Sequence, residues 1–99
     1  MATVIMQKWD GLTPQQYDRL REHVKWDSDI PAGMTYHVAS YDRDTLHMTD
    51  VWDSEEQFVA FVQTRIIPGL QQLGIEGMPE SLVTQTHDVF DLAVVAAQG

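Results

Sequence analysis

Two residues of complementary chemistry fall at matched positions in a predicted β-hairpin. The segments Met34–Tyr41 and Leu46–Asp53 both alternate between polar and apolar residues, and Asp42–Thr45 would form the turn that joins them. With that turn, His37 lies opposite Asp50 on one face of the sheet. A carboxylate beside an imidazole fixes the tautomer of the ring and suits it for general acid–base catalysis. The alternative interpretation is a purely structural pair at a sheet margin, since buried polar groups are normally hydrogen-bonded.

The same pairing predicts which residues share that face. Thr35 would oppose Trp52, and Ala39 would oppose Met48, all on the side of His37 and Asp50. Trp52 would supply a large flat apolar wall. Phe58 would join them from the following helix, and His87 from the last strand, although His87 is equally consistent with a surface or dimer contact. The predicted catalytic pair is His37 and Asp50, and the predicted ligand pocket comprises Trp52, Thr35, Ala39, Met48, Phe58 and His87.

A metal site is not predicted, although the chain has four histidines. No HxH, HxxxH or HxxE spacing occurs, and His37 and His47 point to opposite faces of the predicted hairpin. The absence of cysteine excludes disulfides, thiolate chemistry and cysteine-ligated clusters. We therefore expect a site built from protein side chains, without metal.

The order of the predicted elements indicates the fold. Those elements are a strand at Thr3–Trp9, a helix begun by Thr13-Pro14 and ending before Asp27–Gly33, the hairpin, a second helix from Ser54 that Pro68-Gly69 breaks or kinks, a loop at Gly74–Pro79, and a strand at Val83–Phe90 that Leu92–Ala97 could extend. This β-α-β-β-α-β order predicts an α+β, ferredoxin-like domain, with an antiparallel sheet and two helices on one face. The opposite face would carry Met34, Tyr36, Val38 and Val51. A second subunit covering these apolar residues would produce a homodimer.

Composition sets further bounds. The 99 residues suit one domain, 1–99, of a size often supplemented by a subunit interface. A formal charge of −9, from 15 acidic and 6 basic residues, opposes binding to nucleic acid or to anionic membranes. No apolar run approaches the roughly 20 residues needed to span a bilayer, and the N-terminus does not resemble a signal peptide. We expect a cytoplasmic protein.

The stretch Val51–Phe61, VWDSEEQFVAF, resembles the dimeric α/β-barrel superfamily, in which a strand ending in tryptophan leads into a Ser/Asp cap and a phenylalanine-bearing helix. More narrowly, the chain is similar to antibiotic-biosynthesis-monooxygenase-like members. Their relatives include cofactor-free quinone-forming monooxygenases, haem-degrading monooxygenases, polyketide cyclases and isomerases. The resemblance implies a dimeric barrel with a cleft between sheet and helices in each subunit, with Trp52 in that cleft. The haem-ligating histidine of such relatives has no counterpart in Gln63–Leu70, so no haem is expected.

These observations together favour a small cofactor-independent enzyme acting on an apolar aromatic or polyketide-like molecule. His37 would move a proton and Asp50 would orient the ring, giving either a substrate anion that reacts with oxygen or an enolate for cyclisation or isomerisation. Two alternatives remain. One is a non-catalytic dimer that binds such a ligand. The other is a structural protein whose cleft is filled by its own side chains.

Overall fold

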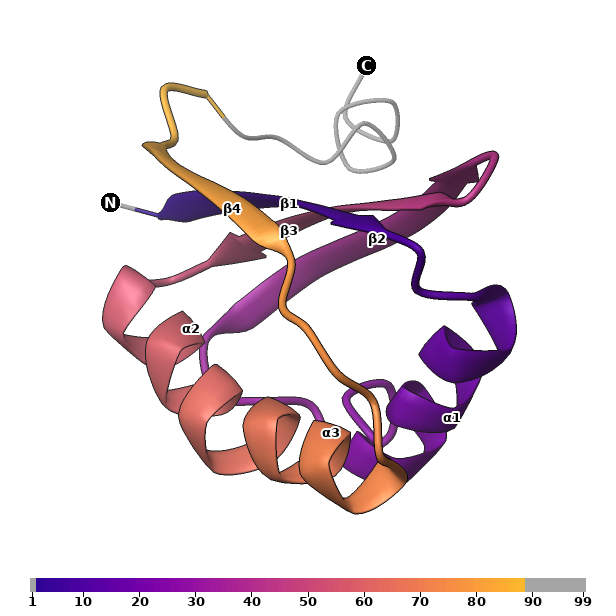
Figure 1. The fold of residues 1–99 in the computed structure, drawn as a ribbon. Coiled ribbons are helices and arrows are strands. Elements are labelled where there is room, and N and C mark those ends of the chain that lie inside the picture. Colours follow the sequence, from indigo (N-terminus) through magenta and orange to yellow (C-terminus); the bar gives the residue numbers. More distant parts are fainter. Residues whose placement is uncertain (1, 89–99) are drawn as a thin grey trace, which may run out of the picture.

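The computed structural model describes residues 2–88, which fold as four strands and a set of helical segments. In chain order the elements are β1 (Thr3–Asp10), α1 (Pro14–Val24), β2 (Met34–Asp42), β3 (Thr45–Trp52), α2 (Glu55–Phe61), the π-helical segment η1 (Val62–Ile66), α3 (Ile67–Leu73) and β4 (Glu80–Gln85). The strands form one antiparallel sheet in the order β2-β3-β1-β4. Figure 1 shows the helices gathered on a single side of this sheet. The predicted ferredoxin-like α+β fold is therefore confirmed.

Both helix starts are fixed by the predicted side-chain caps. The Thr13 hydroxyl accepts a hydrogen bond from the backbone N–H of Gln16 at 3.1 Å, and the Gln16 side chain accepts one from the Thr13 N–H at 2.9 Å. This reciprocal pair satisfies two donors that would otherwise lack partners in the first turn. Ser54 caps α2 through a single bond of this kind, its hydroxyl accepting from the backbone N–H of Gln57 at 3.2 Å.

The second helical region continues through Pro68 instead of ending there. In η1 the ladder widens, so that the N–H of Ile67 bonds to the carbonyl of Val62, five residues earlier. Pro68 then occupies the start of α3, where the missing proline N–H leaves no hydrogen bond unmade. The π-helical segment is thus how the helix accommodates this proline, and the helical path runs on to Leu73.

The hairpin register matches the prediction along most of its length and fails at one end. Tyr41 pairs with Leu46, Ala39 with Met48 and His37 with Asp50. A β-bulge between Met34 and Tyr36 then places Met34, not Thr35, opposite Trp52. A bulge sets two residues against one, which reverses the alternation of faces beyond it. The predicted Thr35–Trp52 pair is therefore wrong, and Met34 packs against the core instead of facing outward.

The last strand also differs from its predicted bounds. β4 begins at Glu80, three residues before the predicted start, because its pairing with β1 runs from Lys8 opposite Glu80 to Thr3 opposite Gln85. The polar residues Glu80 and Ser81 broke the apolar pattern on which the prediction relied. The predicted strand is wrong beyond Gln85, because β4 ends there and residues 86–88 are not in a strand. Val89, Phe90 and the tail Leu92–Ala97 lie outside the described residues.

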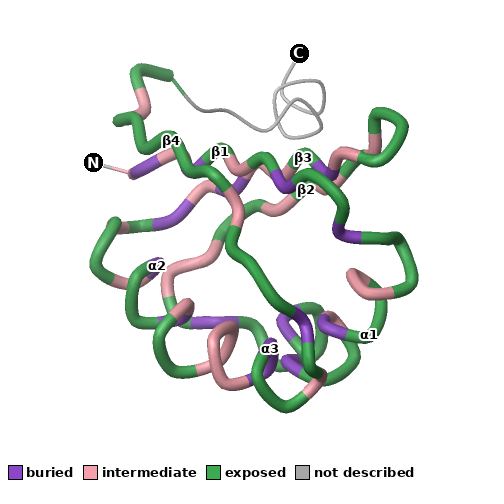
Figure 2. The backbone as a smooth tube through the Cα atoms, viewed as in Figure 1, coloured by how far each residue is buried: buried purple, intermediate pink, exposed green. Residues whose placement is uncertain are grey.

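Buried residues concentrate in the layer between the sheet and the helices (Figure 2). Trp52, Ile5 and Leu46 are completely buried there. The opposite sheet face has no covering element among residues 2–88, and its exposed apolar side chains are Met6, Tyr36, Val38 and Leu82. No helix of the described chain has the length and apolarity to cross a bilayer.

Candidate active site

The predicted His37–Asp50 pair forms as a short hydrogen bond across the hairpin. His37 Nδ1 lies 2.5 Å from Asp50 Oδ1, and the Asp50 residue is only 4% exposed. The second oxygen, Asp50 Oδ2, accepts from the indole Nε1–H of Trp52 at 3.3 Å. Both carboxylate oxygens are thus used, so a buried charge is held by two donors.

A third residue extends this pair into a chain. The hydroxyl of Tyr17 lies 2.8 Å from His37 Nε2, the ring nitrogen opposite the one that faces Asp50. Because an ionised carboxylate can only accept, His37 Nδ1 carries the hydrogen toward Asp50. The neutral ring then has its lone pair on Nε2, which accepts the Tyr17 O–H. The candidate site predicted from the sequence did not include Tyr17. Its spacing from Leu20 and Val24 places it in the apolar stripe of α1, and a phenol within such a stripe is the one local sign of its role.

The environment of Tyr17 keeps its hydroxyl protonated. The pKa of Tyr17 is raised to about 12, mainly by burial of the phenol; the charge of Arg21 opposes this rise, and the charges of Asp50 and Asp18 contribute to it. At neutral pH the phenol is therefore a hydrogen-bond donor and not a base. Within the hydrogen-bonded set of Tyr17, His37 and Asp50, the lone pair on His37 Nε2 is therefore the group that could take a proton from a substrate.

Trp26 completes an aromatic enclosure around the imidazole. Its ring meets Tyr17 edge-on at 5.5 Å and His37 edge-on at 5.8 Å between centroids. Trp26 lies in the turn after α1, which we call the Trp26 turn. Arg65 of η1 fixes this turn, because its Nη2 donates to the carbonyls of Val24 (2.5 Å) and Asp29 (2.8 Å). These contacts limit the movement of the ring that borders His37.

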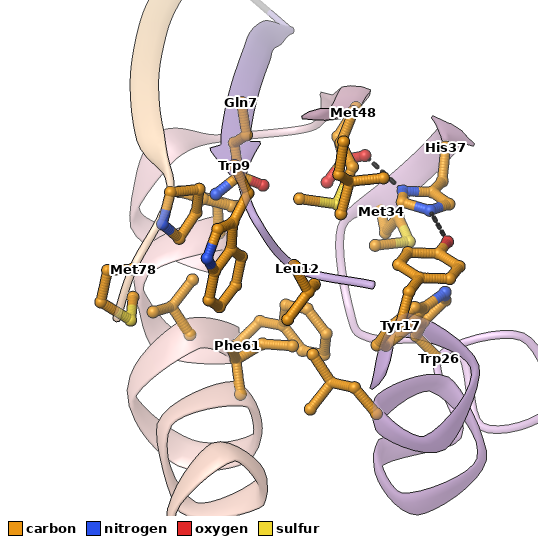
Figure 3. Close-up of a pocket in the computed structure, with 17 residues that line it drawn as sticks. Gln7, Trp9, Leu12, Tyr17, Trp26, Met34, His37, Met48, Phe61 and Met78 are labelled. Atoms are coloured by element: carbon orange, nitrogen blue, oxygen red, sulfur yellow. Dashed lines mark hydrogen bonds and ion pairs between the residues drawn. The ribbon is translucent and has the colours of Figure 1, made fainter. Parts of the chain in front are cut away.

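The imidazole borders an apolar space between the sheet and the helices, which we call the inner cavity. Its volume is about 50 Å³. Figure 3 shows His37, Tyr17 and Trp26 at one end, and Trp9 and Met78 at the other. A cavity this small holds a water molecule or two, whereas drug-sized ligands occupy roughly 300–1,000 Å³. A larger ligand would have to displace flexible lining side chains, of which the methionines Met34, Met48 and Met78 are the most adaptable.

The predicted pocket residues divide into two groups. Met48 and Phe58 line the inner cavity together with His37 and Asp50. Trp52 does not: it is completely buried behind Asp50, packed on Phe58 at 5.6 Å between ring centroids. Its part in the site is to hold the carboxylate, because its indole N–H binds Asp50.

The remaining three predicted pocket residues lie off the inner cavity. Ala39 packs against the core without lining it. Thr35 is exposed because of the bulge, and its hydroxyl donates to the carbonyl of Val51 at 3.1 Å. His87 is exposed after the end of β4. Within residues 2–88, no three His, Asp or Glu side chains converge in a way that could hold a metal ion.

Comparison with solved structures identifies the class of fold. Several of the similar structures are provisionally named antibiotic biosynthesis monooxygenases. A Chloroflexus aurantiacus protein provisionally named as such a monooxygenase has a TM-score of 0.65 and 20% identity, covering 92% of this chain and 98% of its own.

Two further structures have the same architecture. A protein of unknown function from Nitrosomonas europaea has a TM-score of 0.68 and 14% identity, covering 90% of this chain and 92% of its own. SnoaB, a cofactor-independent oxygenase from Streptomyces nogalater, has a TM-score of 0.62 and 14% identity, covering 89% and 94%. No family model and no curated protein matches the sequence. At these identities the likeness extends to the fold alone.

Proposed function

We propose that this protein is a cofactor-independent, monooxygenase-like enzyme that removes a proton from an apolar aromatic or polyketide-like substrate. The observation that carries the proposal is the hydrogen-bonded chain from Tyr17 through His37 to Asp50 at the wall of the inner cavity. This chain places an imidazole oriented by a carboxylate, with a phenol that stays protonated beside it, at the wall of a cavity, which is the set of groups that general acid–base catalysis uses. The fold shared with SnoaB supports the same reaction class.

The proposed chemistry follows from the polarity of this chain. Movement of the Tyr17 hydroxyl away from Nε2 frees the lone pair of His37, which takes a proton from an acidic C–H or O–H of the substrate. Asp50 stabilises the imidazolium that forms. The Tyr17 O–H then donates to the oxyanion of the substrate, since burial keeps this phenol protonated. Apolar walls strengthen both interactions by excluding water.

The substrate anion supplies the electrons for the oxygenation. For a substrate with an acidic methylene, the balanced reaction is R₂CH₂ + O₂ → R₂C=O + H₂O. Electron transfer from the anion to O₂ and recombination form a C–O bond as a hydroperoxide. Loss of water then breaks the O–O bond, so that one oxygen atom stays in the product. The same anion, in the absence of oxygen, would lead to isomerisation or cyclisation.

We also propose that the working unit is a homodimer paired through the outer sheet face. That face exposes Tyr36 and Val38 on the edge strand β2, and Met6 and Leu82 opposite each other on β1 and β4, with exposed fractions between 39% and 57%. Apolar side chains spread over one face in this way favour an interface over contact with water. Sedimentation of wild type and of a Val38→Lys variant tests the dimer: we expect dimer and monomer, respectively.

The experiment that tests the function uses anthrone, a tricyclic ketone with an acidic methylene. Oxygen uptake and anthraquinone formation should proceed above the uncatalysed rate, with one O₂ consumed per anthrone. His37→Ala should reduce the rate to background, while His23→Ala, which removes an exposed histidine of α1, should leave it unchanged. Equal rates in wild type and His37→Ala would exclude His37 from the mechanism.

An anaerobic control in D₂O separates the oxygenase from the alternatives. Exchange of the anthrone methylene hydrogens, dependent on His37 but without oxygen consumption when air is admitted, would favour an isomerase or cyclase. Retention of an aromatic ligand by native mass spectrometry, with neither exchange nor oxidation, would favour a non-catalytic binding protein.

A further inference from the structure

His37 lines a second space besides the inner cavity. This space is an open groove of about 400 Å³ between α1, the turn after it and the start of β2. We call this the outer groove; Arg21, Asp27 and Ile30 belong to it and not to the inner cavity. It lies along the edge of the sheet, because β2 is the edge strand.

The two spaces have four lining residues in common: Tyr17, Trp26, Met34 and His37. These side chains therefore separate the inner cavity from the outer groove, and the reacting imidazole belongs to that partition. Its members differ in mobility. Met34 is flexible and Tyr17 is held by one hydrogen bond through its hydroxyl, whereas His37 is bound at both ring nitrogens.

We propose that the outer groove is the entrance and outer half of the substrate site, and that the substrate is an electrically neutral hydroxy-aromatic molecule. The inference rests on the proposed function, since it takes His37 as the reacting group. Displacement of Tyr17 and Met34 joins the two spaces, which gives a planar ring room that the inner cavity alone lacks. It also breaks the Tyr17–His37 bond, so arrival of the ligand frees the basic nitrogen.

The charges around the groove select against anions. Its one guanidinium, Arg21, lies 3.5 Å from a carboxylate oxygen of Asp18 and 3.9 Å from one of Asp27. Two acidic groups thus surround one basic group, with the buried Asp50 charge behind the partition and a formal charge of −9 overall. A carboxylate ligand would be repelled, whereas a phenol, with a pKa near 10, arrives neutral at pH 7.

A matched pair of ligands tests the substrate class. 2-Naphthol and 2-naphthoate have the same ring system, and only the second is anionic at pH 7. We expect 2-naphthol to bind wild-type protein at least tenfold more tightly, measured by the change in ligand fluorescence. Equal binding, tighter binding of 2-naphthoate, or no saturable binding of 2-naphthol would overturn the proposal.

A matched set of variants tests the route. Ile30 is 65% exposed in the outer groove, so Ile30→Trp should fill the groove without disturbing the fold and slow 2-naphthol association about tenfold in stopped flow. Val59 is 41% exposed on α2, away from both spaces, and Val59→Trp should leave association unchanged. Slower association in Met78→Trp, with Ile30→Trp unaffected, would place the entrance at the opposite end of the inner cavity and refute the proposal.

Indole N–H resonances provide an independent reading, because each tryptophan has a distinct position. Trp26 lies in the partition, Trp9 at the far end of the inner cavity, and Trp52 in the core. We expect 2-naphthol to shift the Trp26 resonance most; a shift of Trp9 without Trp26 would contradict the proposed route.

If groove binding occurs but anthrone is not oxidised, the proposed function fails and the binding site stands. If oxidation of anthrone depends on His37 but is unaffected by Ile30→Trp, the proposed function stands and the proposed entrance fails.

Discussion

Replacing Asp50 with asparagine tests the central hydrogen-bond chain most directly. The carboxylate accepts from His37 and from Trp52, so each oxygen faces a donor. An asparagine of the same shape has one oxygen and one NH₂ group. If the oxygen faced His37, the NH₂ would face the Trp52 N–H, leaving two buried donors without acceptors at a cost of about 1–3 kcal/mol.

The opposite orientation of asparagine avoids that cost. Its oxygen then accepts from Trp52, while its NH₂ donates to His37 Nδ1, which must give up its hydrogen. Two bonds to a charged group become two neutral bonds, a loss of about 1–2 kcal/mol in the free energy of unfolding. For a domain of this size, that corresponds to a fall in Tm of roughly 5–15 °C.

The reorientation also reverses the tautomer of the imidazole. Nε2 of His37 would now carry the hydrogen and donate to the Tyr17 oxygen, so it could no longer accept a proton from the substrate. The equivalent substitution in a serine-protease triad lowers kcat by roughly 10⁴ through the wrong tautomer. We expect a loss of several hundredfold or more in the anthrone assay, much larger than the fall in stability explains.

Nitrogen-15 NMR of the His37 ring distinguishes the two tautomers, and thermal unfolding gives the stability. Asp44→Asn, which changes an exposed turn carboxylate, is the matched control and should alter neither measurement. A His37 ring that retains its hydrogen on Nδ1 in Asp50→Asn, together with unchanged Tm, would refute the account of how Asp50 acts.

Three further substitutions have defined outcomes. Tyr17→Phe should remove the absorbance step near pH 12 at 295 nm. Because burial raises the pKa of Tyr17, its contribution to stability is complete below pH 10 and is lost as pH rises toward 12, by about 1 kcal/mol for a partly exposed group. In urea unfolding, wild type should therefore lose more stability than Tyr17→Phe between pH 10 and 12. Trp52→Phe leaves Asp50 Oδ2 unpaired beside a new void, and should lower the free energy of unfolding by about 2–4 kcal/mol; a change under 1 kcal/mol would contradict its assigned role. Thr13→Ala removes the α1 cap and should cost about 1 kcal/mol, with Thr13→Ser restoring most of it.

The hairpin shows what sequence reasoning could and could not supply. A two-residue alternation and an acidic turn were enough to pair His37 with Asp50, because period and register are local properties. The bulge at Met34–Tyr36 has no such signature, so Thr35 was given the wrong neighbour. The role of Tyr17 depends on how α1 docks against β2, a long-range packing event that no local pattern encodes.

Trp52 illustrates a different limit. The sequence placed it on the correct side of the sheet, yet side alone does not distinguish a cavity wall from the layer beneath it. That distinction depends on how deeply α2 packs, through Phe58 and Phe61, over the end of β3. Depth within a core is set by the volumes of all its side chains together.

The π-helical segment makes the site sensitive to chain length. It contains one residue more than an α-helical path would need, and it presents Val62 and Ile66 to the inner cavity while Arg65 reaches the turn after α1. The wide turn absorbs this extra residue, so that α2 and α3 keep the faces that an uninterrupted α-helix would give them. A further residue inserted in α2 would not be absorbed: it would turn Arg65 by about 100° around the helix axis relative to the start of α2. Arg65 would then release the Trp26 turn, and the enclosure around the imidazole would open while the helix itself stayed unbroken.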